Sequence, residues 1–227
     1  MTTERDEFYY HEMISHIPMM NHPNPESVLV IGGGDGGTIR EVLKHDTVKK
    51  VVLCEIDGMV VEACKKYLPT IGCELDNPKV DVKIEDAIEF IKDKKNEYDI
   101  ILIDSTDPMG PGEGLFTEEF YTNVKEALKD GGIMAAQSES PFINQAEMKK
   151  MYPLLRKVFP IVDTFTGPIP SYPGGYWSWC FCSEKVKPLS YIDEQRAEKI
   201  AKQCKIYNKD YHLARFALPN FVKELVK

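Results

Sequence analysis

Short apolar runs alternate with helix-like segments along most of this chain, and this alternation constrains the fold more than any other feature. The first run, 28–31, is short and continuous, as in a strand that is buried on both faces. Further strands are predicted at 51–54, 80–84, 98–103, 133–137, 161–166 and 176–183. Strands that alternate with helices form a parallel sheet with helices on both faces, so the sequence predicts an α/β fold.

Proline and glycine set the predicted ends of the helices. The first helix is expected at about 6–16 and is ended by Pro18. A later helix at 145–159 contains Pro153, which we expect to kink it or to end it early. The other helices of this part are predicted at 37–43, 58–68, 86–92 and 117 to about 131, with the last ending near the Gly131-Gly132 pair.

The last third of the chain departs from the alternation. The runs at 161–166 and 176–183 flank a turn-rich loop and predict a closing hairpin. The sheet is therefore expected to be mostly parallel with an antiparallel edge hairpin. Residues 1–25 are predicted to form an entry helix and a link, and 191–227 a helical tail packed on the rest. We predict one domain that spans 1–227.

The acidic balance of the chain limits its ligands. The formal net charge of −8 argues against nucleic acid and anionic membranes and suits cationic ligands, although it also serves solubility. No stretch approaches the roughly 20 apolar residues of a membrane helix, and the charged N-terminus is unlike a secretory signal. The cysteines lack zinc-site spacing, and Cys180 and Cys182 are expected to face one side of a strand. We predict a cytoplasmic protein with reduced thiols.

A glycine-rich segment, 32–37, follows the first strand and opens a helix. In this context Gly32, Gly34 and Gly36 predict binding of a nucleotide or nucleoside. Asp35 lies inside the same loop, where its carboxylate repels a pyrophosphate or a carboxylate and attracts an amine. The loop therefore favours a nucleoside that carries positive charge and has no anion nearby.

Acidic residues follow the predicted strands where each strand ends. Glu55 ends the second strand and is placed to accept hydrogen bonds from ribose hydroxyls. Asp86 follows the third strand, and Asp104 and Asp107 follow the fourth. Together with Asp35, five carboxylates are predicted at one edge of the sheet. They indicate a polycationic ligand or a divalent metal, and we rank the metal lower because the acids are spread over four strand ends.

These segments together resemble the spermidine synthases, which are polyamine aminopropyltransferases. The matching segments are TTERDEFYYHEM at 2–13, GGGDGG at 32–37, EID at 55–57, EDA at 85–87, DSTDPMGP at 104–111 and PSYPGGYWS at 170–178. The resemblance spans about 2–185 in unbroken order. It implies a Rossmann-like sheet of the S-adenosylmethionine-methyltransferase type. It also implies transfer of an aminopropyl group from decarboxylated S-adenosylmethionine to putrescine, which gives spermidine and methylthioadenosine.

The resemblance implies roles for single residues. Asp104 matches the catalytic base of the family, and Tyr10 is similar to a tyrosine that assists the nucleophilic amine. The positions that contact the polyamine or the aminopropyl group are matched by His11, Asp35, Asp107 and Tyr172, with Trp177 as a channel wall. The nucleoside contacts are matched by Glu55 at the ribose, by Asp86 and Ala87 at the adenine, and by Pro111 in a neighbouring loop.

Other interpretations stay open at this point. The acceptor amine is putrescine, cadaverine, agmatine or spermidine, and a putrescine N-methyltransferase shares the expected fold. Asp35 argues against the methyltransferase, because ordinary S-adenosylmethionine carries a carboxylate. Typical family members have a small β-domain before the TERDEF segment, and its absence here leaves open a non-catalytic, nucleoside-binding form. We expect no tightly bound cofactor and no metal, and by resemblance a homodimer.

Overall fold

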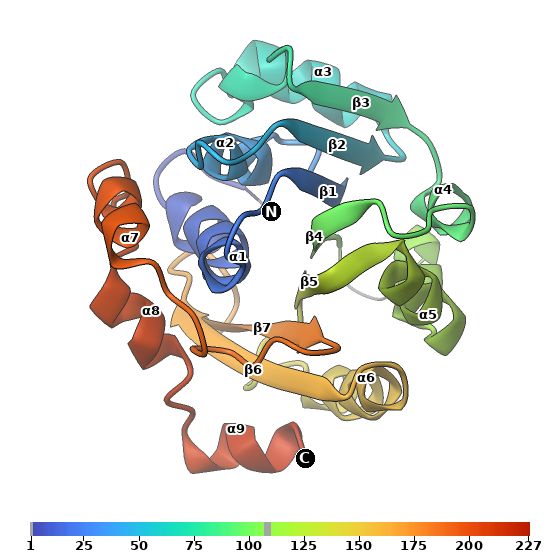
Figure 1. Ribbon diagram of the computed structural model, residues 1–227, viewed down its shortest axis with the longest axis vertical. Helices are drawn as coiled ribbons and strands as arrows, with labels where there is room; N and C mark the ends of the chain where they lie inside the picture. The colour runs from blue at the N-terminus through green and yellow to red at the C-terminus, as the bar shows by residue number, and fades with distance from the viewer. Residues whose placement is uncertain (1, 107–109) are drawn as a thin grey trace.

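A seven-stranded sheet forms the centre of the protein (Figure 1). The computed structural model describes residues 2–106 and 110–227, without the side chains of residues 110 and 111. The strand order is β3-β2-β1-β4-β5-β7-β6. The strands are β1 Ser27–Gly32, β2 Lys50–Glu55, β3 Val80–Ile84, β4 Tyr98–Asp104, β5 Leu128–Gln137, β6 Ile161–Pro168 and β7 Tyr176–Ser183. Only β7 runs antiparallel to its neighbours β5 and β6, so the predicted mostly parallel sheet with an antiparallel edge hairpin is confirmed.

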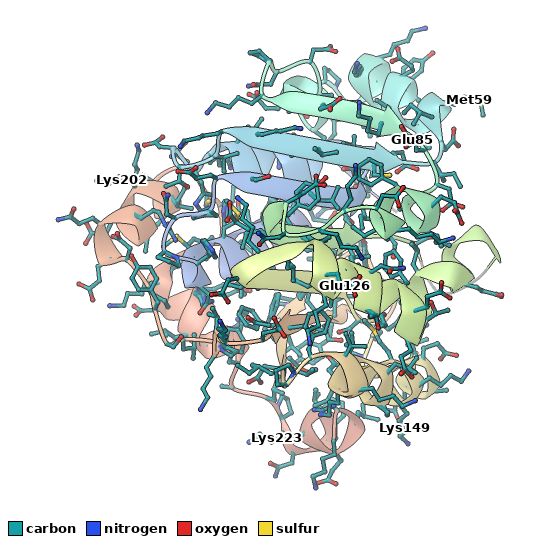
Figure 2. The ribbon with its side chains drawn as sticks, turned by 45° about the vertical axis from the view of Figure 1, so that its right-hand side comes forward. Met59, Glu85, Glu126, Lys149, Lys202 and Lys223 are labelled. Atoms are coloured by element: carbon teal, nitrogen blue, oxygen red, sulfur yellow. The ribbon has the colours of Figure 1, made fainter. Side chains whose placement is uncertain are left out.

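Helices cover both faces of this sheet (Figure 1). On one face lie α1 Phe8–Asn21, α2 Gly37–Leu43, α3 Gly58–Tyr67, α7 Glu194–Ala201 and α8 Lys209–Arg215. On the other face lie α4 Ala87–Lys92, α5 Glu118–Ala127, α6 Gln145–Val158 and α9 Asn220–Leu225. Short 3-10 turns occupy Gly72–Glu74 (η1) and Gly110–Phe116 (η2). Charged side chains on the outer helix surfaces, such as Lys149, Lys202 and Lys223, point away from the sheet in Figure 2.

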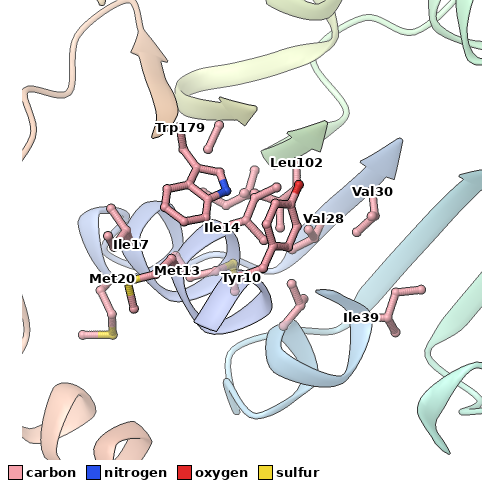
Figure 3. Close-up of a cluster of buried hydrophobic side chains, with 14 of the residues drawn as sticks. Tyr10, Met13, Ile14, Ile17, Met20, Val28, Val30, Ile39, Leu102 and Trp179 are labelled. Atoms are coloured by element: carbon pink, nitrogen blue, oxygen red, sulfur yellow. The ribbon is translucent and has the colours of Figure 1, made fainter. Parts of the chain in front are cut away.

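The central strand β1 is apolar from Val28 to Ile31 because both of its faces are covered. Along β1, Val28 and Val30 pack beneath α1, whereas Leu29 and Ile31 pack on the opposite face. This is the period of two expected for a strand between two helix layers. Figure 3 shows the first of these cores, in which Tyr10 and other side chains of α1 lie against β1 and Leu102.

Two helices continue through prolines that were predicted to stop or disturb them. Helix α1 runs past Pro18 to Asn21, and α6 runs past Pro153 to Val158. A proline inside a helix costs about 3 kcal/mol, because a hydrogen bond is lost and the ring clashes with the preceding turn. Nearly all of α1 is buried, and α6 buries Met148, Tyr152 and two further side chains, so tertiary packing offsets the local cost.

The junction between α5 and β5 also differs from the prediction. The helix ends at Ala127 rather than near Gly131-Gly132, and both glycines lie inside β5. Gly131 has a φ of 77°, and the pairing of β4 with β5 is irregular between Tyr98 and Ile100. The glycine pair therefore forms an irregularity in a strand, because a left-handed residue suits a bulge as well as a helix end.

The first part of the C-terminal tail packs on α1. The Glu12 carboxylate accepts hydrogen bonds from the backbone N–H groups of Lys205, Ile206 and Tyr207, at 2.7–2.9 Å. Arg196 of α7 donates to backbone carbonyls at the end of α1, including that of Met19 at 2.8 Å. The tail thus holds the helix that also carries Tyr10 and His11.

Burial and helix length bear on two smaller predictions. Cys180 and Cys182 are both fully buried and lie in the same core cluster, as their spacing predicted. None of the helices within 2–106 and 110–227 is long and apolar enough to cross a membrane.

Candidate active site

The carboxyl ends of β1, β2 and β4 meet where the strand order changes direction. The last residue of β1, Gly32, pairs with Asp104 at the end of β4, and Glu55 ends β2 on the other side. In open α/β sheets ligands bind at such a switch point. The glycine loop and two of the predicted acids, Glu55 and Asp104, therefore lie at one edge of the sheet, as the sequence predicted.

The glycines of the loop leave room for carboxylates of the protein itself. A Cβ on Gly33 would lie 2.8 Å from the Asp104 Oδ2 atom, and a Cβ on Gly34 would lie 2.9 Å from the Glu55 Oε2 atom. Gly32 has a φ of 73°, and its Cβ would collide with the Asp104 carbonyl oxygen at 2.3 Å. Side chains at these positions would displace the two acids, so the loop requires glycine even without a ligand.

Glu55 is held in place by backbone donors. Its Oε2 atom accepts from the Gly34 N–H at 3.2 Å, and its Oε1 atom accepts from the Asp57 N–H at 3.0 Å. Asp57 itself caps α3 through the Met59 N–H. Glu55 is thus the acid oriented at the loop, and its free lone pairs can accept from a pair of hydroxyls.

At the end of β3, the next strand along this edge, an exposed acid lies near exposed apolar side chains. Asp86 is exposed and caps α4 through the Ile88 N–H at 2.9 Å, whereas Ala87 is buried. Ile84 and Met59 are exposed by 50% and 78%, which is high for such side chains. Met59 of α3 and Glu85, which follows β3, are labelled in Figure 2. The arrangement offers exposed apolar side chains that could contact a base, together with a carboxylate.

Asp104 lies beneath the loop with hydroxyl groups on its carboxylate. Thr38 at the start of α2 donates to the Asp104 Oδ2 atom at 2.6 Å, and Tyr10 of α1 lies close enough to Asp104 to help lower its pKa. Burial raises the pKa of Asp104, and the charge of Asp35 adds to this effect, although His11 opposes it. A carboxyl group with a raised pKa is a better proton acceptor near neutral pH.

Asp35 and His11 form an ion pair beside Asp104. The His11 Nε2 atom lies 3.4 Å from the Asp35 Oδ1 atom. Asp35 also accepts from the Thr2 hydroxyl at 2.6 Å and from the Gly37 N–H at 2.9 Å. Burial alone would raise the pKa of Asp35, but the charge of His11 and these hydrogen bonds hold it well below its usual range. Asp35 is therefore an anion that can attract an amine.

Aromatic side chains pack next to Tyr10 at the site. The Tyr172 ring centroid lies 5.9 Å from that of Tyr10 and 4.8 Å from that of Trp177, in an edge-to-face contact with the latter. Trp177 is only 6% exposed, so it supports Tyr172 from behind. Trp179, which the sequence analysis did not single out, contacts Tyr10 directly at 5.6 Å.

Two predicted site residues fall on parts that are not described. Asp107 lies outside the described residues, and the side chain of Pro111 is not described. A further acid, Glu139, was not predicted from the sequence; it follows β5 and is 1% exposed. The Gln137 side chain brackets it, accepting from its N–H at 3.0 Å and donating to its carboxylate at 3.3 Å. The rule of an acid after a strand end would have found Glu139.

Comparison with known proteins assigns the family of this chain. Residues 7–195 match the family described as spermine/spermidine synthase domain. The chain belongs to the spermine/spermidine synthase family. It is 50% identical over 225 residues to the polyamine aminopropyltransferase of Thermotoga maritima, covering 99% of this chain and 76% of that protein. It is also 50% identical to the enzyme of that name from Clostridium kluyveri, covering 100% of this chain and 81% of the relative.

Solved structures give the same result for the fold. A crystal structure of a spermidine synthase in complex with the transition-state analogue AdoDATO superposes with a TM-score of 0.97 at 50% identity. It covers 100% of this chain and 78% of the other chain. The spermidine synthase of Thermotoga maritima gives a TM-score of 0.92 at 47% identity. The expected family and fold type are confirmed, and the chain is an enzyme of the aminopropyltransferase class.

Proposed function

We propose that this enzyme transfers the aminopropyl group of decarboxylated S-adenosylmethionine to putrescine, which gives spermidine and methylthioadenosine. The observation that supports the proposal most is the meeting of Asp35, His11, Tyr10 and Asp104 at the ends of β1 and β4. Two carboxylates there suit the amines of both substrates. The bound analogue in a structure 50% identical to this chain supports the same chemistry.

In this proposal Asp104 is the base. An alkyl amine has a pKa of about 10.4, so putrescine arrives as an ammonium that cannot attack. Asp104 accepts one ammonium proton, with Tyr10 holding the amine in line. The nitrogen then bonds to the carbon beside the sulfonium, and the electron pair of the carbon–sulfur bond leaves on the neutral thioether of methylthioadenosine. Alignment of the two substrates supplies much of the rate.

The other site residues hold the substrates. Glu55 accepts from the ribose hydroxyls, Asp86 and Ala87 contact the adenine, and Gly32, Gly34, Gly36 and Pro111 shape the nucleoside loop. Asp35 and His11 receive the amine of the aminopropyl group. We assign Tyr172 to the putrescine channel, with Trp177 packed behind it, and by family resemblance we assign Asp107 there too; an aromatic face attracts the cation. Decarboxylated S-adenosylmethionine is thus a co-substrate rather than a bound cofactor.

The experiment mixes the purified protein with both substrates and follows products by mass spectrometry. We expect spermidine and methylthioadenosine in equal amounts. Cadaverine, agmatine and spermidine compete as acceptors, and faster turnover with any of them would replace putrescine in the proposal. Methylated putrescine formed from S-adenosylmethionine would overturn it.

Asp104→Asn tests the base. We expect its kcat to fall about 10²–10⁴-fold while nucleoside binding persists. Asp99→Asn is a matched control, because Asp99 lies at the other end of β4, where it accepts from the backbone N–H groups of Glu26 and Ser27 and from Lys129. Near-normal turnover of the Asp104 variant would remove Asp104 as base.

Three predictions concern the whole protein. We propose that 1–227 acts as one catalytic domain, that it forms a homodimer, and that it works in the cytoplasm. Size-exclusion chromatography with light scattering tests the dimer, and a monomeric mass would contradict it.

A further inference from the structure

His11 has a carboxylate at each of its two ring nitrogens. Its Nδ1 atom lies 2.6 Å from the Glu7 Oε2 atom, and its Nε2 atom faces Asp35 at 3.4 Å. A neutral imidazole carries one N–H and one lone-pair nitrogen, and that lone pair would face the negative charge of one acid, so only the doubly protonated ring is attracted to both. The geometry therefore favours an imidazolium at this position.

Glu7 is itself fixed by a second cation. The Arg40 Nη2 atom lies 2.8 Å from the Glu7 Oε2 atom, and the Arg40 Nε atom donates to Glu41 at 2.8 Å. The side chains of Glu7 and His11 are 5% and 3% exposed. A Cβ on Gly37 would lie 2.3 Å from the His11 ring, so the ring also packs directly on the loop that carries Asp35. The series of contacts from Arg40 through Glu7 and His11 to Asp35 therefore has little freedom to rearrange.

We propose that Glu7, braced by Arg40, is a positioning residue that keeps His11 doubly protonated and aimed at Asp35. The inference rests on the proposed function in one respect, because Asp35 there receives the amine of the aminopropyl group. It adds that His11 accepts no proton during the reaction, which leaves that task to Asp104. It also explains how Asp35 keeps its charge and direction before any amine arrives.

The charged groups around His11 agree with this role. Glu7 faces the ring from α1, Asp35 from the glycine loop and Asp104 from β4, while the ring of Tyr10 lies edge-on at 5.5 Å. Arg40 of α2 acts through Glu7. Burial by itself lowers the pKa of His11, but Asp35 and the other acids raise it to about 10.

The direct test is an NMR titration of the histidine ring protons, which needs no substrate. The His11 signal is assigned by its loss in His11→Gln. In the wild type we expect its midpoint well above pH 8, and in Glu7→Gln a fall of at least about one unit. Glu12→Gln is the matched control, because Glu12 lies on the same helix but holds residues 205–207. Titration of wild-type His11 near pH 6.5, or no shift in Glu7→Gln, would overturn the proposal.

Steady-state kinetics give a second readout. Glu7→Gln should raise the KM for decarboxylated S-adenosylmethionine about 10-fold and change kcat much less, because Asp35 loses its fixed charge and direction. Lowering the pH should bring the KM of Glu7→Gln part of the way back to the wild-type value, because His11 regains its proton. A purely structural role for Glu7 predicts no such recovery. An elevated His11 midpoint without spermidine formation would contradict the proposed function alone, and spermidine formation with an ordinary His11 midpoint would contradict this inference alone.

Discussion

Helix α1 carries histidines at two places, and their surroundings differ. His11 lies at the ligand edge between Glu7 and Asp35. His16 lies one to two turns further on, in a core network in which it contacts His45 at 3.0 Å, Glu41 at 3.0 Å and the Cys204 sulfur at 3.1 Å. The first histidine therefore lies buried between two acids, whereas the second lies in a hydrogen-bond network of the core.

Two neutral imidazoles from other segments, His45 and His212, pack around the C-terminal half of α1. Burial lowers the pKa of His212 to about 4, and its ring nitrogens pair with the Tyr207 hydroxyl at 2.9 Å and the Asn21 amide at 3.1 Å. Burial and the nearby His16 lower the pKa of His45 as well. Uncharged partners cannot offset desolvation of an imidazolium, whereas two carboxylates can. The partners, and not the residue type, decide which histidine carries charge.

The core network around His16 contains side chains of the types that bind metals, but cationic side chains already pair with its carboxylate. In the parts of the chain that the structure describes, His16, Glu41 and Cys204 form a group whose ligand atoms lie within 4.8 Å of one another. Glu41 also accepts from Lys44 at 2.5 Å and from Arg40 at 2.8 Å. The two cations neutralise the carboxylate that a metal would need, so we interpret the group as a hydrogen-bond network.

The largest difference in activity between the two ends of α1, the His11 end and the His16 end, is expected at Asp35. Asp35→Asn should lower kcat/KM about 10²-fold, because a charge-assisted hydrogen bond to the substrate amine is lost. Asp57→Asn is the control, because Asp57 caps α3 and asparagine caps equally well. Steady-state kinetics measure both variants, and an Asp35 variant as active as the control would break the comparison.

The contributions of His11 and His212 to the free energy of unfolding should change with pH in opposite directions. The pKa of His11 is raised from 6.5 to about 10, so its contribution to the free energy of unfolding is complete below pH 6.5 and is lost as the pH rises towards 10. The pKa of His212 is lowered to about 4, so stability falls as the pH drops from 6.5 towards 4. Each effect should reach roughly 1–3 kcal/mol.

Urea unfolding at pH 4.5, 6.5 and 9 checks these signs. The stability difference between wild type and His11→Gln should be largest at pH 6.5 or below and should shrink at pH 9. His212→Gln should lose most relative to wild type at pH 6.5 and least at pH 4.5. Parallel pH profiles for the two variants would show that the ends do not differ in charge.

Glu12 should affect stability without affecting catalysis. Glu12→Gln weakens the bonds from three backbone N–H groups of residues 205–207, which should cost about 1–3 kcal/mol in unfolding free energy. Turnover per folded molecule should stay within about 2-fold, because Glu12 faces the tail. Urea unfolding and kinetics on the same sample test this, and a selective loss of kcat would place the tail in the catalytic machinery.

The smallest effect is expected at Tyr207. Tyr207→Phe removes the hydroxyl that bonds to His212, which should cost about 0.5–1.5 kcal/mol and lower Tm by a few degrees. Tyr98→Phe serves as the comparison, since Tyr98 is buried in the core on the opposite face of the sheet. A larger effect on turnover than on Tm would contradict a purely structural tail.

Local chemistry allowed much of the fold and several site positions to be read from the sequence. The apolar run 28–31 predicted a buried strand because both faces of β1 are covered. Gly32, Glu55 and Asp104 were predicted at one edge because parallel strands end together, and the register places Gly32 beside Asp104. These inferences need only strand direction and residue type.

Tertiary structure decided what depends on contacts between distant segments. Pro18 signals a helix end by itself, yet burial of α1 carries the helix through it. The pairing of Glu7 with Arg40 joins residues 33 positions apart, and no local pattern marks it. His11 and His16 are the same residue on one helix, and only the groups packed around them separate the one between carboxylates from the one in the core. The free energy of a charge depends on its neighbours in space, which the order of residues does not state.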